Sequence, residues 1–443
     1  MDKLLIRNGT LLTMSDDRQP RKADLLVVGG RIKKIDTVVD RNVKPDTIID
    51  ASGMVVLPGF IFGHARLGFS ILRGQVDQLT DDAERERTAL RLIANLTSAQ
   101  VRTSAMLGIC QAVHSGITTL FDGGAMRYTE EIVEVARELG FRLFCGRMLA
   151  DRTRDWPQQL RVPLREQLAD TQALARAVAA VPDGLVRYAV STTNPIMCSD
   201  NCLAQARAAA DSAGCPLKIA LTTDRNQVEV MHREGGTQEL SRLEALGILS
   251  EHTYLVNPSF LSELEQNVVR KAGSRVVINA SADLKLGRPM SRLPEFVRKG
   301  TPVLAGFDSP LYGGRLDAIR ELAIVATAFR PQYGFQTMQP EQALSLLTVD
   351  AARALGIEGE VGTLEEGKQA DIVIVDLGKD IFAQPSAHTN PIYRLVYEAS
   401  ACDVAWTIIA GRVVYGAGTV TGCDEQELLE RAGSDLMHLL EES

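Results

Sequence analysis

Residues 57–68 have the sequence Leu57-Pro-Gly-Phe-Ile-Phe-Gly-His-Ala-Arg-Leu-Gly68, and they separate two different patterns of hydrophobicity. Before them, residues 3–57 contain short runs of Val, Ile and Leu broken by the turn dipeptides Asn8-Gly9 and Gly29-Gly30, a pattern typical of antiparallel strands. After them, as far as about residue 330, short apolar runs alternate with segments of helical spacing. This alternation predicts βα units around a parallel sheet.

Eight apolar runs in the second region are candidates for parallel strands. They are residues 55–62, 118–121, 141–148, 185–191, 216–222, 253–260, 275–281 and 302–308. Each is followed by a helical pattern, for example at residues 130–139, 200–213 and 262–272. Eight such units predict a (β/α)8 TIM barrel, which belongs to the α/β class.

Strand-like sequence returns after a helical stretch at residues 340–355. Residues 370–377 and 403–415 have this character, and we expect them to join the N-terminal strands. The predicted organisation is a composite β-sandwich of residues 1–57 and 359–423, a barrel of residues 58–358, and a C-terminal helix of residues 424–443.

Composition limits the kinds of partner that the protein can bind. The chain has 443 residues and 45% hydrophobic content, so it can bury a large core. Lys and Arg total 48 against 56 for Asp and Glu, and no long basic run is present, which argues against nucleic acid as a partner. No apolar run reaches membrane-spanning length and no secretory signal pattern opens the chain, so we expect a cytoplasmic protein without membrane contact.

Several motifs along the chain resemble those of one known family. They are Pro58-Gly-Phe-Ile-Phe-Gly-His-Ala-Arg66, Ser70-Ile-Leu-Arg-Gly74, Ser115-Gly-Ile-Thr-Thr119, Leu304-Ala-Gly-Phe-Asp-Ser309, Ala351-Ala-Arg-Ala-Leu-Gly356 and Val361-Gly-Thr-Leu-Glu-Glu-Gly-Lys-Gln-Ala-Asp-Ile-Val-Ile-Val-Asp376. Together they resemble the amidohydrolase superfamily, in particular its branch of deaminases and chlorohydrolases that includes cytosine deaminases and triazine hydrolases. The resemblance covers nearly the whole chain. It implies a barrel with a smaller β-sandwich, a small-molecule substrate and a homodimer or larger homo-oligomer.

The resemblance also implies where a catalytic metal would bind. Members of this branch hold it with a His-x-His pair on strand 1, histidines on strands 5 and often 6, and an aspartate on strand 8, and strand 5 adds a proton-shuttling glutamate. At the matching positions this chain retains only His64 and Asp308. The replacements are Arg66 on strand 1, Ala220 and Thr223 on strand 5, and Asn257 and Phe260 on strand 6. The resemblance also matches Thr193 to a substrate-side histidine after strand 4, and Ile278 to the histidine of a strand-7 pattern.

Arg66 is the most informative of these replacements. A guanidinium has no lone pair to donate, and a catalytic zinc needs about three protein ligands. We therefore expect no metal cofactor at this site. A buried carboxylate without a partner is costly, so we predict that Arg66 replaces the charge of the metal and forms an ion pair with Asp308, with His64 beside them.

His64, Arg66 and Asp308 are accordingly the candidate catalytic residues. The predicted substrate-binding residues are Arg73, Thr193, Cys198, Thr223, Asn257 and Asn279. Further polar candidates near the strand ends are Thr192, Asn194, Lys218, Thr222, Asp283 and Lys285.

Three kinds of function remain open at this point. The first is an amidohydrolase-fold protein with a degenerate metal site, which binds a small polar or nitrogen-containing molecule and has lost metal-dependent hydrolysis. The second is an enzyme that performs metal-free elimination, isomerisation or hydrolysis in the same pocket. The third is a conventional hydrolase of C–N or C–Cl bonds.

Overall fold

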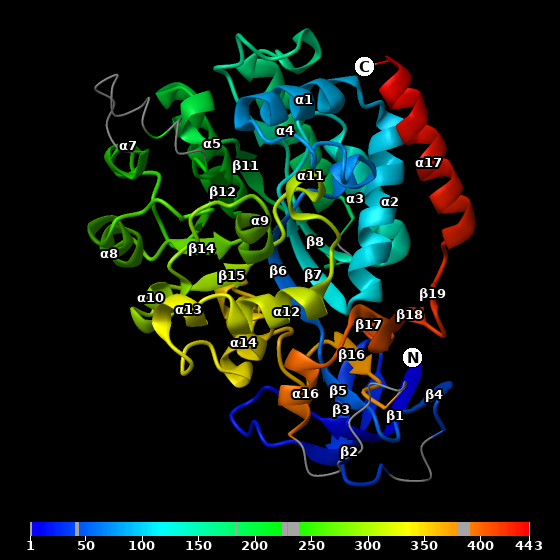
Figure 1. The fold of residues 1–443 in the computed structure, drawn as a ribbon. Coiled ribbons are helices and arrows are strands. Elements are labelled where there is room, and N and C mark those ends of the chain that lie inside the picture. Colours follow the sequence, from blue (N-terminus) through cyan, green and yellow to red (C-terminus); the bar gives the residue numbers. More distant parts are fainter. Residues whose placement is uncertain are drawn as a thin grey trace.

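The computed structural model describes residues 2–39, 44–181, 184–223, 228, 239–378 and 390–442. Its described strands form one mixed sheet, built from both ends of the chain, and two parallel sheets built from the middle of the chain. In Figure 1 the mixed sheet lies at the bottom and the parallel sheets lie above it.

The mixed sheet has the order β19-β18-β17-β16-β5-β1-β2-β3, with β4 paired to β1. Its strands are β1 (Lys3–Leu11), β2 (Arg21–Val28), β3 (Arg31–Asp36), β4 (Thr47–Asp50), β5 (Val55–Pro58), β16 (Ile372–Val375), β17 (Val404–Ile409), β18 (Arg412–Gly416) and β19 (Thr419–Val420). The two ends of the chain meet because β5 pairs antiparallel with β16, with Leu57 opposite Val373. The sandwich and the domain limits at residues 57, 358 and 423 remain predictions.

Each of the eight expected strand regions contains a strand of a parallel sheet. One sheet has the order β10-β8-β7-β6, and the other has the order β15-β14-β13-β12-β11-β9. The strands are β6 (Phe60–Ala65), β7 (Ile117–Asp122), β8 (Arg142–Cys145), β9 (Met148–Leu149), β10 (Val186–Tyr188), β11 (Val190–Thr192), β12 (Leu217–Ala220), β13 (Thr253–Val256), β14 (Arg275–Ile278) and β15 (Val303–Ala305). The α/β class with parallel sheets is therefore confirmed.

Several expected strands differ in their limits. Residues 141–148 and 185–191 each contain parts of two short strands that belong to different parallel sheets. Residues 55–62 were predicted as one strand, but the structure divides them between β5 in the mixed sheet and β6 in a parallel sheet. The division falls at Pro58-Gly59, two residues that commonly interrupt a strand. Residues 275–281 were also predicted as one strand, but β14 ends at Ile278 and a helix begins at Ala280.

The two parallel sheets are linked at both edges. Ala65, at the end of β6, forms an isolated parallel bridge with Asp308 beyond β15. The Phe307 N–H donates to the carbonyl of His64 at 2.7 Å, which extends the same contact. At the other edge, the Ala189 N–H, between β10 and β11, donates to the carbonyl of Cys145 at 3.0 Å. These links bring the ends of strands from both sheets to a common region.

Helices follow the parallel strands and cover them. The longer ones are α1 (Asp82–Asn95), α2 (Ser98–His114), α3 (Thr129–Leu139), α4 (Leu164–Ala179), α5 (Asp200–Ala213), α8 (Glu263–Lys271), α12 (Ala318–Thr327) and α17 (Glu425–Glu442). The shorter ones are η1 (Leu67–Leu72), η2 (Gln158–Leu160), η3 (Pro195–Met197), α7 (Glu239–Ala245), α9 (Ala280–Lys285), α10 (Leu293–Arg298), α11 (Pro310–Gly313), α13 (Arg330–Tyr333), α14 (Pro340–Leu346), α15 (Val349–Leu355), α16 (Pro391–Tyr397) and η4 (Ala401–Asp403).

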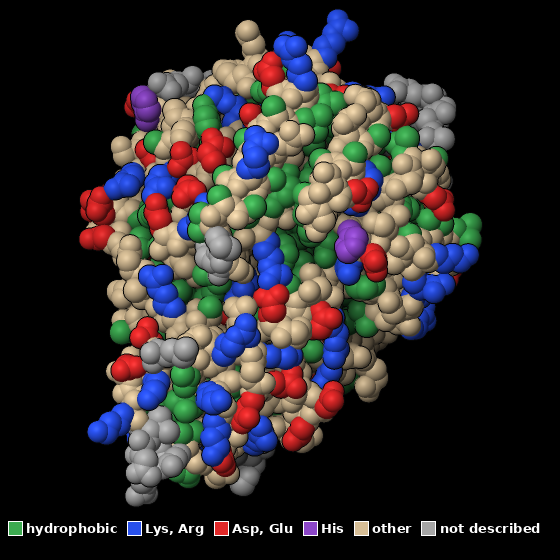
Figure 2. Space-filling view, turned by 180° about the vertical axis from the view of Figure 1, so that it is seen from behind, with side chains coloured by type: hydrophobic (Ala, Val, Ile, Leu, Met, Phe, Trp, Pro, Cys, Tyr) green, Lys and Arg blue, Asp and Glu red, His purple; other side chains and the backbone are tan. Residues whose placement is uncertain are grey.

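The C-terminal helix α17 lies along α2 (Figure 1). The Gln100 side chain of α2 donates to the carbonyl of Asp435 at 3.0 Å and ties the two helices together. None of the helices in the described ranges combines the length and the apolar character needed to cross a membrane. On the face seen in Figure 2, acidic and basic side chains are interspersed.

Candidate functional site

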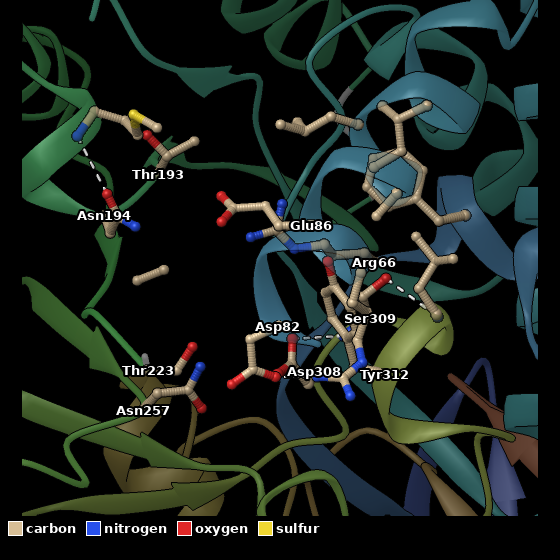
Figure 3. A pocket seen from close by; sticks show the side chains of 18 of the residues that line it. Arg66, Asp82, Glu86, Thr193, Asn194, Thr223, Asn257, Asp308, Ser309 and Tyr312 are labelled. Atoms are coloured by element: carbon tan, nitrogen blue, oxygen red, sulfur yellow. Dashed lines mark hydrogen bonds and ion pairs between the residues drawn. The ribbon is translucent and has the colours of Figure 1, made fainter. Parts of the chain in front are cut away.

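A cavity of about 200 Å3 lies where the parallel strands end and α1 approaches them. Its lining includes Arg66, Thr193, Ala220, Thr223, Asn257 and Asp308. These residues follow or end five different strands, and they are the positions that the sequence resemblance matched to metal-site and substrate-side residues. In Figure 3, Thr193 and Thr223 lie on one side of the open space and Arg66 lies across it.

Arg66 follows β6 directly and is half-buried at the cavity. Its Nη1 donates to the thioether sulfur of Met148 at 2.8 Å. A thioether is a weak acceptor, so this contact satisfies little of the hydrogen-bonding capacity of a guanidinium, which has five N–H donors. Within the described ranges Arg66 forms no ion pair with any carboxylate.

The partner of Asp308 differs from the predicted one. The Asp308 carboxylate pairs with Nη1 of Arg288 at 2.9 Å, so the expected Arg66–Asp308 ion pair is wrong. Arg288 lies just beyond α9, and its guanidinium reaches the cavity from that side. The buried Asp308 carboxylate therefore has a cation beside it, as expected, but this cation is the loop residue Arg288.

Asn279 connects the two strained positions of the cavity. Asp308 and Asn257 have φ values of 62° and 59°, in the left-handed region that few non-glycine residues adopt. The fully buried Asn279 accepts from the Asp308 N–H at 2.9 Å and donates to the Asn257 Oδ1 at 2.5 Å. Asn279 was predicted to bind substrate, whereas its amide is used within the protein and it is absent from the cavity lining.

His64 lies beneath the cavity and is 2% exposed. Its Nδ1 is buried and has no hydrogen-bond partner among the described residues. Burial lowers the pKa of His64 well below its ordinary value, and the charges of Lys218 and Arg66 lower it further. The imidazole is therefore neutral at physiological pH.

Two buried ionisable side chains, Asp122 and Lys218, lie in the strands next to His64. The Asp122 carboxylate of β7 accepts from the Leu67 N–H at 2.7 Å and from the Gly124 N–H at 2.6 Å, which positions the segment after β6. The Lys218 ammonium donates to the carbonyl of Phe121 at 2.7 Å and lies 3.8 Å from the centre of the Phe121 ring. Burial raises the pKa of Asp122 and lowers the pKa of Lys218 well below its ordinary value.

Two other predicted substrate-binding residues lie away from this cavity. Cys198 is fully buried, and its thiol contacts the Leu149 carbonyl and the Thr193 hydroxyl at 3.6 Å each. Arg73 follows the 3-10 helix η1, which directs it away from the strand ends, and its guanidinium donates to Gln111 at 3.0 Å. Position near a strand end placed both residues in the prediction, but side-chain direction decides which surface each one faces.

The further polar candidates are divided in the same way. Asn194 lines the cavity, and its side chain also accepts from the Met197 N–H at 3.2 Å. The Lys285 ammonium pairs with Asp77 at 2.7 Å. Thr192, Thr222 and Asp283 are buried and do not belong to the lining of this cavity.

Sequence reasoning missed the contribution of α1. Asp82, Glu86 and Leu90 recur at intervals of four on this helix and line the cavity. Figure 3 shows Glu86 extending into the open space. The helical spacing of these residues is visible in the sequence, but nothing in it indicates that this face of α1 lies over the strand ends.

Comparison with known proteins gives a consistent family. The model of the amidohydrolase family matches residues 55–414. The chain is 28% identical over 432 residues to a 5-methylthioadenosine/S-adenosylhomocysteine deaminase of Syntrophobacter fumaroxidans, covering 97% of this chain and 96% of that protein. It is 24% identical to a 5'-deoxyadenosine deaminase of Methanobrevibacter smithii, with 99% of each chain covered.

Solved structures have the same fold. An adenosine deaminase from Xanthomonas campestris with bound zinc matches with a TM-score of 0.90 and 22% identity, covering 99% of this chain and 98% of that one. An atrazine chlorohydrolase from Arthrobacter aurescens TC1 complexed with zinc matches with a TM-score of 0.87 and 20% identity, covering 98% and 100%. At these identities the likeness concerns the fold alone. Since the family match spans most of the sequence, this protein belongs to the amidohydrolase family.

Proposed function

We propose that this protein binds a small polar or nitrogen-containing molecule in the cavity at the strand ends and has lost metal-dependent hydrolysis. The observation that carries the proposal is Arg66, a permanently charged guanidinium at the position where the family motif places a metal ligand. The two parallel sheets would form the expected (β/α)8 barrel, and their contacts at Ala65–Asp308 and Cys145–Ala189 support it. We expect a homo-oligomer.

Among the described residues, the donor set around the cavity does not fit a resident catalytic metal. In the ranges that the structure describes, no three His, Cys, Asp or Glu side chains gather closely enough to hold one. His64 and Asp308 are adjacent through the contact of β6 with the segment after β15. Arg66, Ala220 and Asn257 at the cavity supply no carboxylate, imidazole or thiolate, and the Asp308 carboxylate already pairs with Arg288.

A second candidate is a metal-dependent deaminase that acts on a small nitrogen-containing substrate. It is favoured by the full-length similarity to curated deaminases. Under this alternative, ligands beyond those recognised in the family motif would complete the metal site.

Metal analysis separates the two candidates. Protein purified without chelator is expected to contain far less than one zinc or iron per chain, and to release no ammonia from 5'-deoxyadenosine, 5'-methylthioadenosine or S-adenosylhomocysteine. Stoichiometric metal together with ammonia release would overturn the proposal and establish the deaminase.

A gain-of-ligand variant tests whether position 66 corresponds to a metal-ligand position. Arg66→His would place a third potential ligand beside His64 and Asp308, which approaches the number that zinc needs. We expect zinc to raise the Tm of this variant and to leave the Tm of the wild type unchanged, because binding to the folded state alone stabilises it. Arg85→His is the matched control, since Arg85 lies at the same cavity but away from His64. Equal responses of both variants would contradict the assignment.

A further inference from the structure

We propose that the ligand of this cavity is a small aromatic carboxylate and that its carboxylate group binds the guanidinium of Arg66. This inference rests on the proposed function, because it takes the cavity at the strand ends as a ligand site. It adds the chemical class of the ligand and the residue that recognises the charged group.

Among the described residues, the guanidinium of Arg66 has only a weak acceptor. This guanidinium lines the cavity, and its one hydrogen bond among the described residues goes to the Met148 sulfur. Charged groups that are partly removed from water are normally satisfied by strong acceptors. A carboxylate accepts two parallel N–H bonds from a guanidinium, so it is the acceptor with the best geometric match.

The other two arginines of the lining are already neutralised. Arg85 pairs with Asp82 of the same helix, and it also donates to the carbonyl of Leu79 at 2.6 Å. Arg288 pairs with Asp308 at 2.9 Å. Among the residues that the structure describes, Arg66 is therefore the arginine of this lining that pairs with no carboxylate.

The buried ionisable groups next to Arg66 do not remove its charge. The Asp122 carboxylate accepts from the backbone N–H groups of Leu67 and Gly124, and its pKa, which burial raises, is lowered in part by the charges of both Lys218 and Arg66. The low pKa of His64 keeps its imidazole uncharged. Among the described residues, neither Asp122 nor His64 therefore forms an ion pair that neutralises the Arg66 guanidinium.

The remainder of the cavity lining suits the aromatic ring of a ligand. Phe69, Trp156 and Tyr312 contribute aromatic surface, and Leu90 and Met197 add apolar surface. The volume of about 200 Å3 lies below the range of about 300–1,000 Å3 common for drug-sized ligands and favours a single-ring molecule.

Benzoate and benzamide provide a matched pair of probes. They have nearly the same shape, but only benzoate carries a charge at neutral pH. Titration calorimetry on metal-free wild-type protein is expected to show benzoate binding about tenfold or more tightly than benzamide, which corresponds to one charge-assisted hydrogen-bonded contact. Equal affinities, or no binding of benzoate, would overturn the inference.

Substitutions at two arginines test the named contact. Arg66→Met should abolish the preference for benzoate over benzamide, and Arg66→Lys should restore part of it, because lysine keeps the charge but not the two parallel donors. Arg85→Met removes the same formal charge from the same lining, but its guanidinium is already bound to Asp82. It should change the preference by about threefold or less, as expected for a screened charge at a distance.

Glu86 gives a test of opposite sign. Glu86 of α1 belongs to the same lining, so Glu86→Gln removes a negative charge from the cavity and should strengthen benzoate binding while leaving benzamide binding nearly unchanged. Weaker benzoate binding in this variant, or an equal loss in Arg66→Met and Arg85→Met, would refute a carboxylate held by Arg66. The Tm of each variant confirms that it is folded.

The two proposals fail in distinguishable ways. If the isolated protein contains stoichiometric metal and deaminates nucleosides, the proposed function fails, whatever the probes show. If the protein is metal-free but binds benzoate and benzamide equally, the proposed function stands and the inference about the carboxylate fails.

Discussion

At the scale of single residues, Asp283 on α9 has a fully buried carboxyl group behind the cavity. Burial raises its pKa to about 7, and its Oδ1 has no partner among the described residues. In the unfolded chain the pKa of an aspartate is about 3.9. Between these two values the folded state binds more protons than the unfolded state. The stability that the neutral carboxyl contributes is therefore complete below about pH 4 and is lost as the pH rises through about 7.

Asp283→Asn should remove this loss, because an amide stays neutral at every pH. We expect the variant to match the wild type near pH 4 and to exceed its free energy of unfolding above pH 7, by at most about 4 kcal/mol for a shift of about three units. Denaturant titrations from pH 4 to 8 measure the difference. Asp155→Asn, in an exposed loop, is the control, and it should follow the wild type throughout. Stability curves that stay parallel for Asp283→Asn would contradict the prediction.

The candidate site shows what single residues reveal in a sequence. Arg66, Thr193, Thr223, Asn257 and Asp308 were named from a motif, and all of them line one cavity. Motif positions carry this information because they fix both the strand and the face of each side chain. For Cys198, which lies outside the motifs, closeness to a strand end was the only guide. Arg73 lies within the motif Ser70-Ile-Leu-Arg-Gly74, but its side chain is absent from the cavity lining.

The partner of Asp308 could not be chosen from sequence. Two cations, Arg66 and Arg288, line the same cavity as Asp308, and Arg288 forms the ion pair. Which of them pairs depends on loop geometry after α9, and a hydrophobic pattern contains no information on that geometry.

At the scale of elements, the approach of β6 to β15 determines how the cavity is built. A Cβ atom on Gly306 would lie 2.3 Å from Oδ1 of Asn279 and 2.9 Å from Cβ of His64. Both neighbours are buried, and Asn279 is fixed by its bonds to Asp308 and Asn257. Gly306→Ala should therefore destabilise the fold by about 2 kcal/mol or more, in the range for overpacking of a core.

The C-terminal helix offers a control with the opposite sign. Gly433 lies within α17, and a Cβ there would meet no atom within 4 Å. Gly433→Ala should stabilise the protein by about 0.5–1 kcal/mol, because alanine has less backbone entropy to lose in a helix. Chemical denaturation of both variants measures the pair. A Gly306→Ala protein as stable as the wild type would show that β6 and β15 are less tightly packed than the structure indicates.

The positions of elements followed from sequence more closely than their ends. Apolar runs located all eight strand regions, because a buried parallel strand needs a continuous hydrophobic segment. The same runs extended beyond the paired residues, as at residues 253–260, where β13 ends at Val256. A strand ends where its pairing with the neighbouring strand ends. This end depends on both segments, so the hydrophobic pattern of one segment cannot predict it.

At the scale of the whole molecule, one ion pair joins the parallel sheets to the mixed sheet. Arg142 of β8 contacts Asp371, just before β16, through Nε and Nη2 at 2.9 Å each. The two side chains are 1% and 2% exposed, and 229 residues separate them in the sequence. No local pattern could reveal this contact, although each residue lies in a segment whose strand was predicted.

Replacing one partner of this pair should cost more than replacing both. Arg142→Met leaves a buried carboxylate without its cation, and we expect a loss of about 3–5 kcal/mol in the free energy of unfolding. Adding Asp371→Asn removes the uncompensated charge and keeps an oxygen that can accept the Ala410 N–H, which now lies 2.8 Å from the carboxylate. The double variant should therefore be less destabilised than the sum of the two single variants, with a coupling of about 1–3 kcal/mol.

The exposed pair Arg353–Asp350 on α15 provides the matched cycle. Its side chains are 55% and 44% exposed, and a pair of this kind is worth less than about 1 kcal/mol. Denaturant unfolding of the four proteins in each cycle gives both coupling energies. A coupling at Arg142–Asp371 no larger than that at Arg353–Asp350 would mean that the buried pair does not hold the two parts of the molecule together. A large coupling would show that the buried pair holds β8, the strand that precedes Met148, against the mixed sheet.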